Sequence, residues 1–178
     1  MTEAEVVART QAWVDQVVIG LNLCPFAKAV VAKRQVRYVV CMDSDPEQVL
    51  KLLQTELQHL VDTDPEQLDT TLLIAPNVLP DFLAFNEFLF DCDSVLLSSG
   101  LEGVLQIADF HPRYQFAGTQ ADDISNFTNR SPYPTLHLLR EDSIDKAVAA
   151  FPDASQIYER NVKVLEALGK EGWEALGS

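Results

Sequence analysis

The stretch QVRYVVCMDSDPEQVLKLLQTELQHLV, residues 35–61, joins a predicted β-strand to a predicted helix. Its first part, residues 35–42, is rich in the β-branched and aromatic residues that favour strands. Asp45 suits the helix N-cap and Pro46 the first helical position, and apolar residues then recur along one face to about Val61. A strand followed directly by an amphipathic helix indicates an α/β architecture.

The same alternation continues on both sides of this unit. Upstream, Thr2 and Glu5 predict a capped helix that ends near Gly20, before an irregular segment. Downstream, the pattern predicts strands at 70–75, 103–110 and 135–140 and a helix from about Pro80. It also predicts two helices after the last strand. The first begins at 142 or 143 and buries Ile144, Ala147, Val148 and Phe151, and the second spans 155–168 and is closed by Gly169. We expect an α/β fold, a single-domain sandwich over residues 1–178 with a four-stranded mixed sheet and flanking helices. One strand, after a long loop, is expected to be antiparallel.

The size and composition of the chain favour a soluble protein of one domain. Its 178 residues suffice to bury a core, and 47% hydrophobic against 22% charged residues is typical of globular proteins. No apolar run approaches the ~20 residues that span a bilayer, and the first residues lack the pattern of a secretory signal. We therefore expect a cytoplasmic location and no membrane partner. The cysteines, Cys24, Cys41 and Cys92, form no CxxC pair, so reduced thiols are expected.

The distribution of charge indicates one candidate anion site. The net charge of -14 argues against nucleic-acid binding, which depends on clustered Lys and Arg. Between Lys51 and Arg113 the sequence has eleven acidic residues and no Lys or Arg. Bases gather instead at residues 28–37, a pattern typical of a solvated face, and at Arg113, Arg130 and Arg140. Arginines this scarce, placed near histidines, favour a site for a small anion.

A long connection, residues 111–133, lies between the third and fourth predicted strands. Most connections in compact domains have about 4 to 6 residues, so a loop of this length is typical of a functional or a disordered segment. Its aromatic residues favour an ordered loop packed on the body. It begins at the carboxyl end of a strand, where ligands bind in open α/β sheets, and this places His111 and Arg113 at the expected edge.

These observations lead to the hypothesis of an enzyme that acts on a small anionic substrate bearing phosphate or carboxylate. Histidine is the usual acid or base near neutral pH, and arginine presents a planar fork of donors to such anions. The proposed catalytic residues are His111, His137 and Asp122, and the proposed substrate-binding residues are Arg113, Arg130, Arg140, Asn126, Asn129 and Cys24. Strand alternation puts His137 and Arg140 on opposite faces, so one of them is expected to face away from a common site.

Simpler roles compete with each assignment. Asp122 can cap a short helical turn, His137 can be a buried histidine bonded to a carbonyl, and Cys24 can serve packing. A metal set of His111 and His137 with a carboxylate lacks any diagnostic ligand spacing, and the sequence specifies no cofactor. The alternative function is a non-catalytic module that binds a metabolite, or that uses its acidic interval as a protein contact face.

Four segments of the chain resemble a bacterial protein family known as domain of unknown function 1415. They are GLNLCPFAKAV, TTLLIAP, GLEGVLQIADFHPRYQFAG and NFTNRSPYPTLHLLRE, in this order. The resemblance spans nearly the whole chain, and the last two segments are long enough to be specific. It implies a single soluble domain of bacterial type. It assigns no activity, cofactor or catalytic residue, so the site hypothesis rests on the residues themselves.

Overall fold

The computed structural model describes residues 1–150 and 156–176, and a four-stranded mixed sheet lies at its centre. The strands are β1 (Val36–Val40), β2 (Thr70–Ile74), β3 (Leu105–Phe110) and β4 (Thr135–Arg140). Their order across the sheet is β1-β2-β4-β3, with β1 parallel to β2 and β4 antiparallel to both of its neighbours. The α/β fold, the mixed sheet and the antiparallel strand after the long loop are confirmed.

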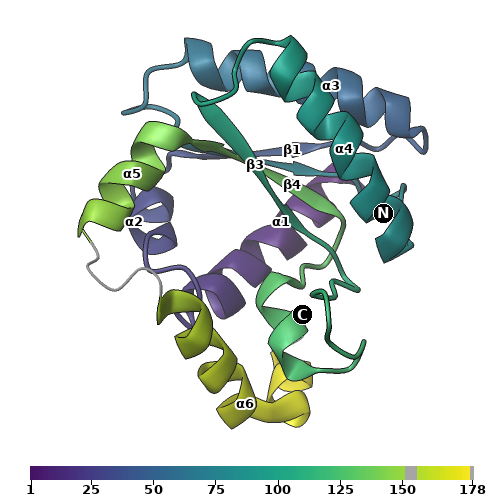
Figure 1. Ribbon diagram of the computed structural model, residues 1–178, viewed down its shortest axis with the longest axis vertical. Helices are drawn as coiled ribbons and strands as arrows, with labels where there is room; N and C mark the ends of the chain where they lie inside the picture. The colour runs from purple at the N-terminus through teal and green to yellow at the C-terminus, as the bar shows by residue number, and fades with distance from the viewer. Residues whose placement is uncertain (151–155, 177–178) are drawn as a thin grey trace.

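Helices cover both faces of this sheet. They are α1 (Glu3–Trp13), the π-helix η1 (Val14–Ile19), α2 (Ala27–Ala32), α3 (Pro46–Asp62), α4 (Phe82–Ser98), the 3-10 helix η2 (Ile124–Asn129), α5 (Glu141–Ala150) and α6 (Ile157–Ala175). Figure 1 shows α3 and α4 on one face and α1, α2, α5 and α6 on the other. Along the described residues, no helix is both long and apolar enough to cross a membrane.

Thr2 and Asp45 cap their helices as expected, whereas α5 begins at Glu141, ahead of the predicted start at residue 142 or 143. The Thr2 hydroxyl accepts from the Glu5 amide while the Glu5 carboxylate accepts from the Thr2 amide, which completes a capping box. The Asp45 carboxylate accepts from the Glu47 amide, and Pro46 occupies the first turn of α3. Each cap satisfies amides that the helix itself leaves without partners.

The sheet separates two hydrophobic cores. One core packs α3 and α4 against the sheet and is centred on Leu53, Leu57, Phe85 and Leu138, each no more than 2% exposed. The other packs α1, η1, η2 and α6 against the opposite face and includes Val6, Trp13, Ile74, Phe127 and Leu165. All residues of β2 are buried, as expected for a strand covered on both faces.

The predictions for the last helices have three different outcomes. Gly169 has non-helical geometry, with φ 67°, and separates two helical segments of α6, so the first segment ends there as predicted and a second, unpredicted segment continues to Ala175. Val148 of α5 is 47% exposed instead of inward, because α5 packs only one narrow side on the sheet. The residues Phe151 and Ser155, which were predicted to lie in helices, fall outside the described residues.

Candidate functional site

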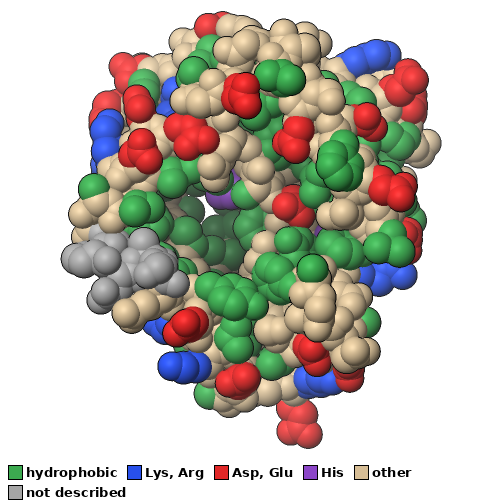
Figure 2. Space-filling view, viewed as in Figure 1, with side chains coloured by type: hydrophobic (Ala, Val, Ile, Leu, Met, Phe, Trp, Pro, Cys, Tyr) green, Lys and Arg blue, Asp and Glu red, His purple; other side chains and the backbone are tan. Residues whose placement is uncertain are grey.

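A cavity of about 350 Å³ lies on the sheet face that α1, α2 and α5 cover. Its floor consists of side chains from all four strands, among them Tyr38, Leu72, Phe110 and His137. Its walls come from the end of α1, from η1, from α2 and from α5. Figure 2 shows this hollow open to the surface, with hydrophobic side chains around it and a histidine visible inside. The volume falls in the range of about 300–1,000 Å³ that is usual for small-molecule pockets.

The imidazole of His137 is the main polar group on this floor. The ring is half-buried, its centroid lies 6.0 Å from that of Phe110, and among the described residues it makes no hydrogen bond. Desolvation by the apolar surroundings lowers the pKa of His137 from 6.5 to about 4. The ring is therefore neutral near physiological pH, with one nitrogen able to donate and one able to accept.

Three other polar side chains around the cavity, those of Asp69, Thr70 and Ser143, are engaged with the protein. The Asp69 carboxylate accepts a hydrogen bond of 2.6 Å from the Ser143 hydroxyl. The Thr70 hydroxyl donates to the Leu138 carbonyl at 2.6 Å. Burial raises the pKa of Tyr38 to about 12, so its phenol stays protonated. The lining contains no Lys or Arg among its described residues, and Asp69 is its one charged residue.

Two further residues of the cavity wall come from the N-terminal third of the chain. Cys24 lines the cavity and is half-buried, whereas Cys41 and Cys92 are buried elsewhere in the core. Trp13 also lines the cavity and packs edge-on against Phe110, with ring centroids 5.2 Å apart. Its indole Nε1 is buried and has no hydrogen-bond partner among the described residues. Cys24 thus lies at the cavity and not at the long loop, and its ligand-binding role stays a prediction.

His111, the expected acid or base, is fully buried on the other side of the sheet beside α4. Its Nδ1 accepts from the Arg113 amide at 3.0 Å, so its Nε2 carries the proton and donates to the Leu79 carbonyl at 3.0 Å. Burial lowers the pKa of His111. Leu79 has a left-handed φ of 52°, so the ring braces a strained turn before α4. Both ring nitrogens are occupied by this structural role.

The arginines that sequence reasoning grouped together do not meet. The Arg113 guanidinium donates to the Pro80 carbonyl. The Arg130 guanidinium lies 4.0 Å over the Phe127 ring and donates to the Ala121 carbonyl at 2.6 Å. Each of these guanidinium groups is therefore used to satisfy backbone carbonyls of the long loop or of the turn before α4.

Arg140 faces the core between α3 and the sheet, and it is 8% exposed. Its guanidinium donates to the carbonyls of Leu60, Thr63 and Leu68, at distances from 2.5 to 3.2 Å. Leu60 and Thr63 lie at the carboxyl end of α3, where helix carbonyls lack partners and a positive charge is favourable. Arg140 thus caps α3 from β4, and His137 points to the opposite face, as strand alternation predicted.

The polar residues of the long loop largely satisfy one another. Asn126 is fully buried, accepts from the Phe116 amide and the Thr119 hydroxyl, and donates to the Gln120 carbonyl. The Asn129 amide donates to the Asp109 carbonyl at 3.4 Å. These contacts account for the order of a segment that is mostly irregular.

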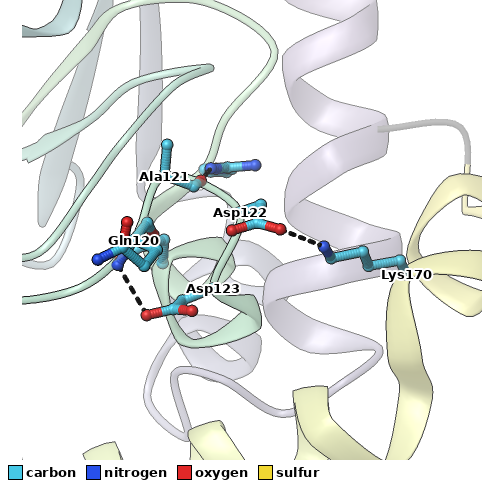
Figure 3. Close-up of polar contacts among 7 residues, drawn as sticks. Gln120, Ala121, Asp122, Asp123 and Lys170 are labelled. Atoms are coloured by element: carbon cyan, nitrogen blue, oxygen red, sulfur yellow. Dashed lines mark hydrogen bonds and ion pairs between the residues drawn. The ribbon is translucent and has the colours of Figure 1, made fainter.

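Asp122 lies on the surface of this loop. Figure 3 shows its carboxylate directed at Lys170 of α6, and the two groups form an ion pair of 3.1 Å. This partner holds the pKa of Asp122 below its usual range. The neighbouring Asp123 accepts from the Gln120 amide at 2.8 Å. The pair ties the loop to α6, and neither of its residues lines the cavity.

Comparison with known proteins gives one match. Over residues 5–175 the chain matches the family described as "Protein of unknown function (DUF1415)". The chain belongs to this family. No curated protein and no solved structure matches it. The DUF1415 match confirms the family resemblance seen in the four sequence segments.

For this DUF1415 chain, the sequence reasoning missed the apolar part of the cavity. Ala27, Val30 and Val31 line it from α2, and their i, i+3, i+4 spacing was a readable helical signal after Pro25. The polar groups expected at one site are instead spread over both faces of the sheet. Within residues 1–150 and 156–176, no group of three or more His, Cys, Asp and Glu is placed to hold a metal ion.

Proposed function

We propose that the protein binds a small, uncharged and largely apolar molecule in the cavity, with the imidazole of His137 as its hydrogen-bond partner. The observation that carries this proposal is the position of His137: a neutral imidazole on an apolar floor, without a hydrogen-bond partner among the described residues. The half-buried ring lies on the floor of a cavity that opens to the surface (Figure 2), so a bound molecule that covers it has to supply a hydrogen-bond partner. A ligand hydroxyl, amide or carbonyl would supply the partner.

The charge of the lining supports an uncharged ligand. An anion placed against this floor would lose its hydration without gaining a cation, because no described lining residue is Lys or Arg. A cation would find only the Asp69 carboxylate, which already accepts from Ser143. The apolar side chains from η1, α2 and α5 favour a ligand that buries hydrocarbon or aromatic surface.

Binding, rather than proton transfer, is the role that the titration of His137 supports. An efficient acid or base has a pKa near the working pH, and the pKa of His137 is about 4. The enzyme for anionic substrates expected from the sequence stays a rival proposal. It would require Arg113 and Arg130 to release the backbone carbonyls to which they now donate.

A pair of dyes with the same ring scaffold separates the two proposals. Phenylnaphthylamine is uncharged and carries one N–H donor, whereas anilinonaphthalene sulfonate adds an anionic group. We expect the uncharged dye to bind with a rise in fluorescence and the sulfonate to bind at least roughly tenfold more weakly, since a buried unpaired charge is costly. Tighter binding of the sulfonate, lost in Arg113→Ala, would favour the anion-binding rival.

A matched pair of variants locates the dye. Ala147 of α5 lines the cavity and Ala149 of the same helix is exposed. Ala147→Phe is expected to fill the cavity and abolish dye binding, whereas Ala149→Phe is expected to leave it unchanged. His137→Leu keeps the apolar volume but removes the hydrogen bond, and we expect it to weaken dye binding by about fivefold to tenfold. Equal binding by all three variants would overturn the proposal.

A further inference from the structure

Helix α4 carries large apolar side chains on its outer surface. Leu83, Phe90 and Leu97 are 72%, 71% and 62% exposed, respectively. They are spaced seven residues apart, so successive members lie two helical turns apart on nearly the same side of the helix. We call these three residues the α4 stripe. At a rise of 1.5 Å per residue, the stripe extends over about 21 Å.

The α4 stripe is separate from the face that holds α4 on the protein. Phe85, Phe88 and Cys92 are buried toward the sheet and α3, at 2%, 6% and 0% exposure. The helix is thus apolar on two sides, although only one side is covered by the described residues. Singly exposed apolar residues are ordinary on protein surfaces, but three aligned along one helix are typical of an interaction face.

The charge beside the α4 stripe has one sign. Glu87, Asp91 and Asp93 are exposed on the same helix, and α4 carries no Lys or Arg. The whole interval between Lys51 and Arg113 has eleven acidic residues and no Lys or Arg. A surface with apolar side chains bordered by carboxylates is complementary to one with apolar side chains bordered by bases.

We propose that the α4 stripe docks a basic amphipathic helix of a partner protein, with Leu83, Phe90 and Leu97 packing on its apolar face and Glu87 and Asp93 pairing with its Lys or Arg side chains. The exposed length of α4 suits a partner helix of three to four turns laid along it. Charge argues against a second copy of this chain on the same face, because two copies of α4 would bring carboxylates together. Anionic lipid is disfavoured for the same reason.

Fluorescence anisotropy with two synthetic peptides tests the proposal. One labelled amphipathic peptide carries Leu on one face with Lys on either side, and the other is identical but has Glu in place of Lys. We expect the Lys peptide to bind the full chain, the Glu peptide to bind at least roughly tenfold more weakly, and added salt to weaken the Lys peptide. Equal binding of both peptides would overturn the proposal.

Substitutions on the exposed face identify the contact. Phe90→Ser and Leu97→Ser are each expected to weaken the Lys peptide by roughly tenfold or more, as loss of a central apolar anchor does. Both side chains are exposed, so folding should be retained and is checked by circular dichroism. Val148→Ser, at a 47% exposed apolar residue of α5, is the matched control and is expected to bind as the unchanged protein does.

A charge-reversed variant tests the role of the carboxylates, and two further measurements test whether a second copy or lipid occupies the α4 stripe. Glu87→Lys combined with Asp93→Lys is expected to weaken the Lys peptide and to strengthen the Glu peptide. Unchanged affinity for both peptides would contradict the charge argument. If sedimentation shows a dimer that Phe90→Ser abolishes, the occupant of the α4 stripe is a second copy of the chain and the proposed basic helix is rejected. If the protein binds neutral phosphatidylcholine vesicles and Phe90→Ser abolishes that binding, the occupant is lipid and the proposed basic helix is likewise rejected.

Discussion

The imidazole of His137 and the guanidinium of Arg140 lie on opposite faces of strand β4. His137 faces the cavity beneath α2 and α5, whereas Arg140 donates to three carbonyls around the end of α3. Both side chains come from the six residues of one strand, and alternation alone separates them. One strand thereby fixes a helix on one face and presents a polar group to a cavity on the other.

Removal of Arg140 should destabilise the fold strongly. Arg140→Met leaves the carbonyls of Leu60, Thr63 and Leu68 without their donor, and we expect the free energy of unfolding to fall by about 2–4 kcal/mol. Urea denaturation measures this change. Arg34→Met, at an exposed arginine, should shift the free energy of unfolding by no more than about 0.5 kcal/mol. Similar losses in both variants would contradict the capping role.

The stability of the protein should fall as the pH is lowered, in part because of His137. Its folded pKa of about 4 lies below the ordinary 6.5, so on acidification the unfolded chain takes up the proton first. The contribution of neutral His137 to the free energy of unfolding is complete above pH 6.5 and is lost as the pH falls to about 4. At roughly 1.4 kcal/mol per pKa unit, the total loss is about 3 kcal/mol. His137→Leu should lose this part of the pH dependence. Urea midpoints of both proteins across this interval measure it, and parallel curves would contradict it.

Asp109 should contribute a pH dependence of the opposite sign. Burial raises the pKa of its carboxyl, so the native state holds the proton more tightly than the unfolded chain. The resulting stability is complete below the ordinary pKa of 3.8 and is lost as the pH rises through the folded pKa. Asp109→Asn should therefore raise the melting temperature by a few °C at neutral pH, and less in acid.

The control for Asp109 is Asp122→Asn on the loop surface. Asp122 gains a partner in Lys170, which lowers its pKa, so neutralising it should leave the melting temperature unchanged or slightly lower it. Scanning calorimetry of both variants at neutral and acidic pH measures the difference. An equal rise in both would point to a general effect of net charge instead of the burial of Asp109.

Cys24 should be the one cysteine that reacts readily in the folded protein. Cys41 and Cys92 are 6% and 0% exposed, and burial raises the pKa of Cys92 to about 12. Cys24 lines the cavity and is half-buried. Mass spectrometry after treatment with N-ethylmaleimide should show one adduct, which Cys24→Ser removes and phenylnaphthylamine slows. Labelling that the dye does not slow would place the dye away from Cys24.

The fold was largely readable from local patterns. The pattern predicts the strand at residues 135–140 with its observed bounds, since Leu136 and Leu138 alternate with residues that belong to the opposite face and Pro134 precedes the strand. The strand order β1-β2-β4-β3 was not readable, because it depends on contacts between residues far apart in the sequence. No local signal tells where a strand inserts.

The candidate site was readable only in part. Alternation correctly separated His137 from Arg140, but residue type could not distinguish an arginine that binds an anion from one that satisfies a carbonyl. A loop of 23 residues contains many backbone groups that need partners, and Arg130 and Asn126 supply them. The cavity comes from four helical elements (α1, η1, α2 and α5) and the sheet together, and only its α2 wall had a periodic signal.

The place of β4 between β2 and β3 has a consequence for how the chain folds. The Thr70 hydroxyl of β2 donates to the Leu138 carbonyl of β4, across a sequence separation of 68 residues. Until β4 has been synthesised, β2 and β3 each have an edge without its partner, and such edges are prone to aggregation. Completion of the sheet therefore waits for nearly four fifths of the chain, and a nascent chain that ends before Thr135 should depend on chaperones.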